Sequence, residues 1–379
     1  MRLIIYTGKG GTGKTVTACA TAIKLAESNH KTLLISSDPA HTLSDALTYE
    51  IGYETRDIMH NLKAIEIDPI FELTTKYIDL LSYTTNYLFG KGIDSHIAYE
   101  IAMMPGMTQL FSLLKIDEEV RKKDFDAIIL DMPPSGEALK FLYFPKIVGS
   151  LGKNYLNLSN FFGGIAKVFQ PFAGYYKSLD SFISHGDILR RLENLFNIIT
   201  DQSITSLRLV TNVDTFSVKN AKRALMSANL FGINVDLVII NKININNHEA
   251  KKDVERIETN FFPLPCKRAK LNSREVRGID MLKKHGEEIF SIQDPSTIFF
   301  KENIYSIEEN NNSISIKFKI PFVKDADIQT TKINDEVLIQ IKHSIGYIAN
   351  SVSLPLAAIN MKLVSTRLLN NILEIVLKR

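Results

Sequence analysis

The sequence predicts a mixed α/β fold, in which helices cover a mostly parallel sheet, with helical insertions and a small C-terminal all-β sandwich. Three observations lead to this prediction. Short apolar runs alternate with helix-length segments over residues 1–292, two long intervals are mainly helical in pattern, and period-two alternation dominates after residue 291. At 379 residues the chain is long enough for one large domain and a smaller companion.

The expected strands are short, apolar and rich in β-branched residues. They lie at Arg2–Thr7, Thr32–Ser36, Ala64–Ile67, Ala127–Leu130, Leu207–Val210 and Val235–Ile240. After the first strand, Thr15–Ser28 shows the apolar spacing of a helix, and helix-length segments separate most of the other strands. Near-continuous apolar strands that alternate with helices indicate a parallel sheet buried on both faces.

Two helical insertions interrupt this alternation, at about residues 72–123 and 146–202. Both are unusually rich in tyrosine, phenylalanine, leucine and methionine. Aromatic residues at helical spacing usually pack as core, but adaptable apolar surfaces also suit variable partners. The sequence leaves both interpretations open: a hydrophobic groove or a buried core.

The character of the chain changes at residues 293–302, which contain Asp294-Pro295-Ser296 and are expected to form a linker. Beyond it, apolar residues alternate with polar ones around Ile316, Ile339 and Ile375. This period of two predicts half-buried strands. We therefore expect a large α/β domain over residues 1–292 and a β-sandwich over residues 303–379.

Composition excludes several classes of protein. Lys plus Arg (45) nearly balance Asp plus Glu (42), so we expect no nucleic-acid partner. The two cysteines, Cys19 and Cys266, cannot build a disulfide framework or a four-thiolate zinc site within one chain, and they fit a reducing compartment. Since no apolar run approaches the length of a membrane span, we expect a cytoplasmic protein.

The strongest motif follows the first strand and matches G-x-x-x-x-G-K-[ST]. It comprises Gly8, Lys9, Gly10, Gly11, Thr12, Gly13, Lys14 and Thr15. Its position between a strand and a helix is the one that a phosphate-binding loop requires, and it predicts a P-loop NTPase. The glycines allow backbone N–H groups to surround phosphate oxygens, and the helix N-terminus adds partial positive charge. We expect ATP as the nucleotide, Lys14 at its β- and γ-phosphates, and Thr15 as a ligand of Mg²⁺.

Two aspartates follow later strands and face the same edge of the expected sheet. Asp38 follows the strand that ends at Ser36, and we expect it to orient the attacking water in ATP hydrolysis. Asp131 follows the strand Ala127–Leu130 and is expected to hold Mg²⁺, directly or through water. A cap for the turn after Asp131 is the structural alternative, and the two roles are compatible.

Residues 38–46 (DPAHTLSDA) and 131–136 (DMPPSG), together with the loop GKGGTGKT, resemble the anion-transporting ATPase family. That family contains the arsenite-pump ATPase and the ATPases that deliver tail-anchored membrane proteins. The resemblance covers residues 1 to about 292 and includes Asn241, which it implies contacts adenine, and Asp214, which falls at an acidic nucleotide contact. Lys9 matches the extra lysine of the deviant Walker A class, which implies a homodimer in which Lys9 reaches the partner's nucleotide.

The sequence also departs from the family pattern. Glu137 stands where the family commonly has histidine, and neither the zinc-binding cysteine pair nor the metalloid-binding cysteine set is present. No zinc is therefore expected. The resemblance implies an ATPase whose nucleotide state controls the binding of hydrophobic clients such as membrane-protein segments, with membrane contact only through clients or a receptor. The alternatives are an anion or metalloid pump-driving subunit and a nucleotide-switched scaffold that acts through its β domain.

The last segment, residues 303–379, resembles an α-crystallin-like domain of the small heat-shock-protein type. The supporting features are strand spacing, Leu354-Pro355 and the run Asn371-Ile372-Leu373. Shielding of an apolar groove, binding of a partner and simple stabilisation all remain open as its role.

Overall fold

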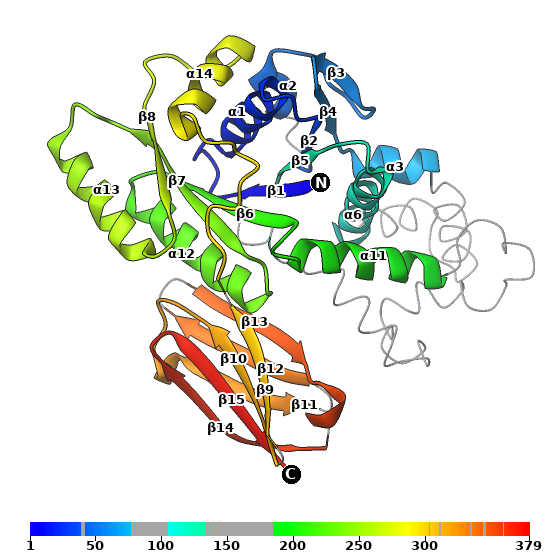
Figure 1. The fold of residues 1–379 in the computed structure, drawn as a ribbon, viewed down its shortest axis with the longest axis vertical. Coiled ribbons are helices and arrows are strands. Elements are labelled where there is room, and N and C mark those ends of the chain that lie inside the picture. Colours follow the sequence, from blue (N-terminus) through cyan, green and yellow to red (C-terminus); the bar gives the residue numbers. More distant parts are fainter. Residues whose placement is uncertain are drawn as a thin grey trace, which may run out of the picture.

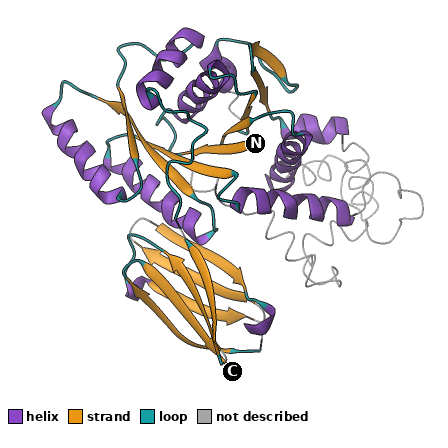
Figure 2. Cartoon of the chain, viewed as in Figure 1, coloured by secondary structure: helices purple, strands orange, loops and turns teal. Residues whose placement is uncertain are grey.

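A computed structural model gives the fold of the chain (Figures 1 and 2). It describes residues 1–38, 42–76, 105–133, 139, 142, 185–302, 304–310, 312–333, 336–343, 346–358 and 360–379.

An eight-stranded sheet forms the centre of the larger part of the molecule. Its order is β3 (Arg56–Met59), β4 (Leu62–Glu66), β2 (Thr32–Ser36), β5 (Ala127–Asp131), β1 (Arg2–Thr7), β6 (Thr205–Thr211), β7 (Val235–Ile243) and β8 (Cys266–Lys270). Only β3 runs antiparallel to its neighbour; every other neighbouring pair is parallel. The carboxyl ends of β1, β2 and β5 therefore meet at one edge, where ligands of open α/β sheets bind.

Helices cover both faces of this sheet (Figure 1). One face carries α1 (Lys14–Glu27), α2 (Thr42–Leu47) and α14 (Ile279–Phe290), and the other carries α6 (Pro105–Lys122), α11 (His185–Thr200), α12 (Thr215–Leu230) and α13 (His248–Phe261). Successive residues of β1 take opposite sides: Ile4 and Tyr6 pack with the first set, and Leu3 and Ile5 with the second. This strand is buried on both faces, as its unbroken apolar run predicts.

Two antiparallel sheets form the C-terminal sandwich (Figure 2). The first has the order β14 (Lys362–Leu369), β15 (Ile372–Lys378), β10 (Ser313–Lys319) and β9 (Tyr305–Asn310), and the second has the order β11 (Ile328–Ile333), β12 (Glu336–His343) and β13 (Gly346–Ser353). Short 3₁₀ turns lie at Asp325–Asp327 and Leu356–Ala358. The alternating residues Ile316, Ile339 and Ile375 are fully buried between the sheets. The predicted fold class, α/β with an all-β sandwich, is confirmed.

The sandwich packs against the C-terminal end of α12. Asn229 Nδ2 donates to the backbone oxygen of Lys319 at 3.0 Å, and Asn350 Nδ2 donates to that of Leu230 at 2.7 Å. The Phe261 and Phe322 rings meet edge to face, with centroids 6.0 Å apart. Buried apolar residues of the two parts belong to one continuous cluster. The sandwich is thus fixed to the α/β part by a shared core.

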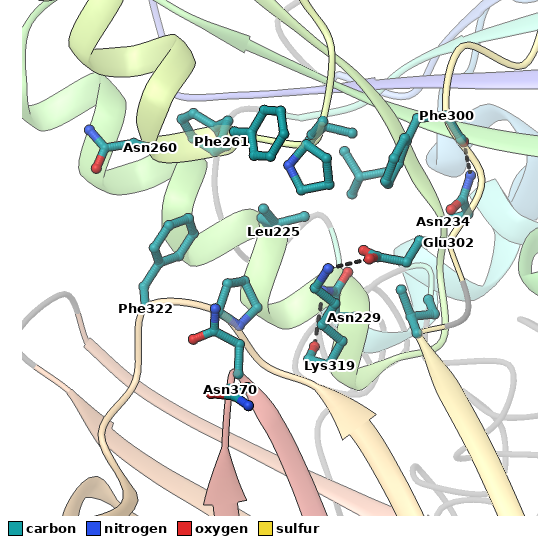
Figure 3. A pocket seen from close by; sticks show the side chains of 17 residues that line it. Leu225, Asn229, Asn234, Asn260, Phe261, Phe300, Glu302, Lys319, Phe322 and Asn370 are labelled. Carbon is teal, nitrogen blue, oxygen red and sulfur yellow. Dashed lines mark hydrogen bonds and ion pairs between the residues drawn. The ribbon is translucent and has the colours of Figure 1, made fainter.

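A pocket of about 220 Å³ lies at this junction, between α12, the end of α13 and the sandwich (Figure 3). Leu225 and Phe322 supply apolar walls, while Lys319 and Glu302 form an ion pair at its side. It lies at the opposite end of α12 from the phosphate loop.

The segment predicted as a linker, residues 293–302, contains no helix or strand among its described residues. It is nevertheless held along its length. The fully buried Arg208 of β6 donates to the backbone oxygen of Pro295 at 2.7 Å, and Arg2 Nε donates to that of Ser296 at 2.9 Å. Arg208 also pairs with Asp236 (3.2 Å) and lies over the Phe299 ring. The domain boundaries at residues 292 and 303 stay predictions.

The described parts of the two predicted insertions are helical: α3 (Pro69–Lys76), α6 and α11. The aromatic stretches between them, residues 77–104 and 146–184, lie outside the described residues, as does Glu137, so the choice between groove and core stays open. Among the helices that the structure describes, none is long and apolar enough to cross a membrane.

Candidate nucleotide site

The glycine-rich loop joins β1 to α1 in a conformation that requires glycine. Gly11 and Gly13 have φ angles of +81° and +90°, where other residues are strained. A Cβ at Gly8 would lie 2.3 Å from the backbone oxygen of Val210. Gly13 precedes α1 and provides no side-chain cap, so the loop and the first turn of α1 can offer backbone N–H groups to an anion.

At the start of α1 lie three of the predicted residues, Lys14, Thr15 and Asp131. The Thr15 hydroxyl donates to Asp131 Oδ2 at 2.7 Å, and Thr15 Oγ1 lies 3.2 Å from Thr42 Oγ1. Asp131 is completely buried, and this burial raises the pKa of its carboxyl to about 6, although the Lys14 charge and the Thr15 hydrogen bond oppose the increase. Its Oδ1 atom has no hydrogen-bond partner among the described residues.

Asp38 lies just beyond the end of β2 and is almost fully buried. Its backbone N–H donates to Ser36 Oγ at 3.2 Å. The negative charge of Asp38 contributes to the raised pKa of Asp131, so the two carboxylates share one electrostatic environment. The structure thus brings Asp38, Lys14, Thr15 and Asp131 to one edge of the sheet, while residues 39–41 lie outside the described residues.

Asn241 and Lys242, near the end of β7, hold the backbone of the loop. Asn241 Nδ2 donates to the Thr12 oxygen at 2.9 Å, and Lys242 Nζ donates to the Gly11 oxygen at 2.8 Å. Lys242 has a φ of +55°, an uncommon conformation for this residue type. The contact described for Asn241 is thus with the loop, and its contact with adenine stays a prediction.

Asp214 and Lys9 lie at the N-terminus of α12. Asp214 caps this helix, accepting from the Ser217 N–H at 2.9 Å and from the Ser217 hydroxyl at 2.6 Å. Burial raises the pKa of Asp214, but these hydrogen bonds and the Lys9 charge outweigh it, so the pKa lies below its usual value. Lys9 is exposed and its Nζ lies 5.7 Å from the centroid of the Phe216 ring. A nucleotide contact by Asp214 stays a prediction.

Sequence reasoning did not identify Lys242 or Glu66 as parts of this region. Glu66 ends β4, and its carboxylate accepts from the backbone N–H groups of Leu43 (2.9 Å) and Ser44 (3.0 Å) in α2. The signal for Glu66 was present, because a carboxylate at the carboxyl end of an apolar strand is the same pattern that identified Asp131. The Lys242 contact gave no such signal, since its partner is a backbone oxygen far away in the sequence.

A parallel sheet whose first strand leads through a glycine-rich loop into a helix, with a buried aspartate beside the Thr15 hydroxyl, defines a P-loop nucleoside triphosphatase. The chain belongs to the anion-transporting ATPase family, whose family model matches residues 1–291. It is therefore an ATPase that binds ATP and hydrolyses it to ADP and phosphate.

Relatives fall into two groups. An arsenical pump-driving ATPase of Prosthecochloris vibrioformis is 32% identical over 93% of this chain and 91% of its own length. One from Aquifex aeolicus is also 32% identical, over 90% of this chain and 92% of its own length. The ATPase get3 of Aspergillus terreus is 27% identical over 76% of this chain and 90% of its own length. The bacterial matches thus extend over more of the chain than the fungal match.

Proposed function

We propose that the protein is a Mg²⁺-dependent ATPase that acts as a homodimer and whose nucleotide state controls the binding of hydrophobic clients such as membrane-protein segments. The observation that carries the proposal is the convergence of Asp38, Lys14, Thr15 and Asp131 at one edge of the sheet. The family membership supports the hydrolysis step, and the resemblance to ATPases that deliver tail-anchored proteins supports the choice of client.

The residues beside α1 fit a magnesium ion. Hydroxyl and carboxylate oxygens are the ligands that Mg²⁺ prefers, and Asp131 Oδ1, buried and without a partner among the described residues, is available to such an ion or to its water. Thr15 and Asp131 would hold the ion, which would neutralise charge on the phosphates. Lys14 and the loop N–H groups bind the phosphates in this proposal.

Asp38 is proposed to orient the attacking water. In phosphoryl transfer, positioning matters more than proton abstraction, so a carboxylate of ordinary basicity is sufficient. Replacing Asp38 by asparagine preserves the shape of the side chain and removes its charge. We expect Asp38→Asn to bind nucleotide and to hydrolyse it at least about 100-fold more slowly, and unchanged turnover would contradict this role.

Lys9 is proposed to cross to the nucleotide of a second subunit. Lys9 belongs to the phosphate loop and is exposed, while Lys14 of the same loop serves the phosphates in cis in this proposal. We expect the Asp38→Asn protein to dimerise with ATP in analytical ultracentrifugation and the Lys9→Ala/Asp38→Asn protein to remain monomeric, with nucleotide affinity retained. Lys31→Ala, which removes another exposed lysine, is the matched control. ATP-dependent dimers of the Lys9 variant would overturn the dimer proposal.

Client binding is tested with a defined probe. A fluorescent peptide with 20 leucine and alanine residues, flanked by lysines, approximates a membrane segment. Its anisotropy should rise with Asp38→Asn protein in ATP and not in ADP, and a control peptide with serine and glutamine in place of leucine should not bind. Equal signals in ATP and ADP, or none, would contradict nucleotide-controlled capture and favour the scaffold alternative.

A pump-driving role is the second candidate, because the 32% identical relatives with that name match most of the chain. The thiols of this chain argue against metalloid binding. Burial raises the pKa of Cys19 well above its usual value and that of Cys266 to about 12, so neither thiol readily becomes the thiolate that a soft metalloid requires. Stimulation of wild-type turnover by arsenite, absent from Cys266→Ala, would favour the pump. The free thiols fit the cytoplasm as the proposed location.

A further inference from the structure

Helix α2 immediately follows the segment that carries Asp38, and it is too short to be stable by itself. It spans Thr42–Leu47, only six residues, and isolated helices of that length do not persist in water. Its first hydroxyl, Thr42 Oγ1, lies 3.2 Å from Thr15 Oγ1 and hence next to the pair that Thr15 makes with Asp131. Something outside α2 must therefore fix its position.

Glu66 supplies that contact from the neighbouring strand. Its Oε1 accepts from the N–H groups of Leu43 and Ser44, and its Oε2 accepts from the Ser44 hydroxyl at 2.9 Å. The N–H groups at the start of a helix lack partners within the helix, so one carboxylate satisfies two of them and also places a negative charge at the positive end of the helix dipole. Ser44 Oγ in turn accepts from the Ile51 N–H at 3.2 Å, which holds the chain beyond α2.

Strand geometry fixes Glu66 relative to Asp38. Glu66 is the last residue of β4 and is paired in register with Ser36, the last residue of β2. Ser36 Oγ accepts from the Asp38 N–H, and the Ser36 backbone oxygen accepts from the Ile67 N–H at 2.9 Å. The two adjacent strand ends therefore hold Asp38, through Ser36, and helix α2, through Glu66.

We propose that Glu66 is the positioning residue for α2: its buried carboxylate fixes this helix, and through it sets Thr42 beside Thr15 and the geometry at Asp131 and Asp38. The inference rests on the proposed roles of Asp38, Thr15 and Asp131. It adds a residue of β4 to a site that otherwise draws on β1, β2, β5 and β7. Glu66 acts through α2 and requires no contact with nucleotide.

The test compares Glu66→Ala, Glu66→Gln and Glu72→Ala in steady-state ATPase assays over a range of Mg²⁺ concentrations. Glu72 is the matched control, because it is equally buried (4% exposed, against 3% for Glu66) and pairs with Lys76 and Lys115 in α3 and α6, away from α2. We expect Glu66→Ala to lower kcat about 10-fold or more and to raise the half-saturating Mg²⁺ concentration, with the Kd of Mg²⁺-free ATP within about twofold of wild type. Glu66→Gln keeps an acceptor oxygen for the two N–H groups and should retain most of kcat.

A second readout does not depend on activity. The chain has no tryptophan, so Tyr49→Trp places a single fluorophore just after α2. Acrylamide should quench this fluorophore more strongly in the Tyr49→Trp/Glu66→Ala protein than in the Tyr49→Trp protein. Quenching in the Tyr49→Trp/Glu72→Ala protein should not change. Ser44→Ala removes one of the three contacts and should give a smaller change of the same sign.

Three results would overturn the proposal: a kcat of Glu66→Ala within about twofold of wild type, an equal loss in Glu72→Ala, or no rescue by Glu66→Gln. Failure of the underlying function is recognised separately. If Asp38→Asn in the same series keeps wild-type turnover, the proposed site is wrong whatever the Glu66 variants do.

Discussion

The Thr15 hydroxyl donates to Asp131 Oδ2 at 2.7 Å, while Oδ1 of the same buried carboxylate has no hydrogen-bond partner among the described residues. The Thr15 hydroxyl therefore orients Oδ2, while Oδ1 is buried and accepts no hydrogen bond from the described residues. Burial raises the pKa of Asp131 to about 6, above the value near 3.9 expected for the unfolded chain.

The first prediction concerns the pH dependence of stability without nucleotide or Mg²⁺. A pKa raised by folding gives stability that is present below about pH 4 and is lost as pH rises through about 6. Asp131→Asn has no charge to bury, so its stability relative to wild type should improve by about 1.4 kcal/mol between about pH 5 and about pH 7.5. This is about half of the full effect, because the other half has already occurred below about pH 5. Urea unfolding at both pH values measures the difference, and a constant difference would contradict the prediction.

The second prediction concerns Gly13, whose hypothetical Cβ would lie 2.3 Å from Asn241 Nδ2. Gly13→Ala should weaken ADP binding by about 10-fold or more, because the loop must move and the φ of +90° becomes strained. Asn241→Ala removes the collision, so Gly13→Ala should weaken ADP binding less in the Asn241→Ala protein than in wild type. Equilibrium binding of a fluorescent ADP analogue measures the change.

A matched control separates strain from collision. Gly52 has a φ of +98° but nothing within 4 Å of a hypothetical Cβ, so Gly52→Ala tests the backbone strain by itself. It should cost about 1–2 kcal/mol of stability and leave ADP binding unchanged. If Gly13→Ala weakens ADP binding equally in wild type and in the Asn241→Ala protein, the collision with Asn241 is not the cause.

The third prediction concerns the fully buried pair of Arg208 and Asp236. Arg208→Met leaves the Asp236 carboxylate buried without its partner and should lower the free energy of unfolding by about 3–5 kcal/mol. Arg208→Met/Asp236→Leu should recover part of that loss. Arg268→Met is the control: Arg268 pairs with Glu258 at 2.7 Å but is mostly exposed, so its loss should cost less than about 1 kcal/mol. Equal costs for both arginines in urea unfolding would refute the prediction.

The fourth prediction concerns His285 in α14, a buried residue whose two ring nitrogens have no hydrogen-bond partner among the described residues. Burial lowers the pKa of His285, more than the nearby Glu288 raises it. A lowered histidine pKa gives stability that is present above about pH 6.5 and is lost as pH falls. His285→Leu should therefore flatten the acid side of the stability profile below pH 6.5, while the exposed-site variant His60→Gln should not. Parallel profiles for wild type and His285→Leu would argue against it.

The predictable part of the fold is the part in which local pattern and burial agree. β1 and β2 have the same bounds as the apolar runs, because these strands are buried on both faces and need an unbroken run. β3 and β8 were missed for the opposite reason. Only Ile58 of β3 and Ala269 of β8 are buried, and edge strands of this kind lack the continuous apolar signal.

The candidate site likewise has a part that could be predicted from the sequence and a part that could not. The loop and the aspartates are local motifs, so their places could be predicted from spacing. The long-range contacts of the surrounding fold were not predictable, even where the residue itself, Asn241, was expected at the site. Arg208 reads as a polar interruption of an apolar strand, although it binds a segment 87 residues away, and Asn241 binds a backbone oxygen 229 residues away. Such contacts depend on register between distant strands, which no local pattern encodes.

Helix α12 is capped by Asp214, near Lys9, and ends at Leu230, which accepts a hydrogen bond from the sandwich. Because the sandwich and α12 share one core, we expect the sandwich to move with the helix if the helix tilts. The C-terminus lies at the end of the sandwich that is farther from the α/β part (Figure 1). A rotation of α12 that moves the phosphate loop only slightly would displace the C-terminus by a larger distance. With fluorescent labels at Arg379→Cys and on the α/β part, energy transfer between the two labels would report how their distance changes with the bound nucleotide.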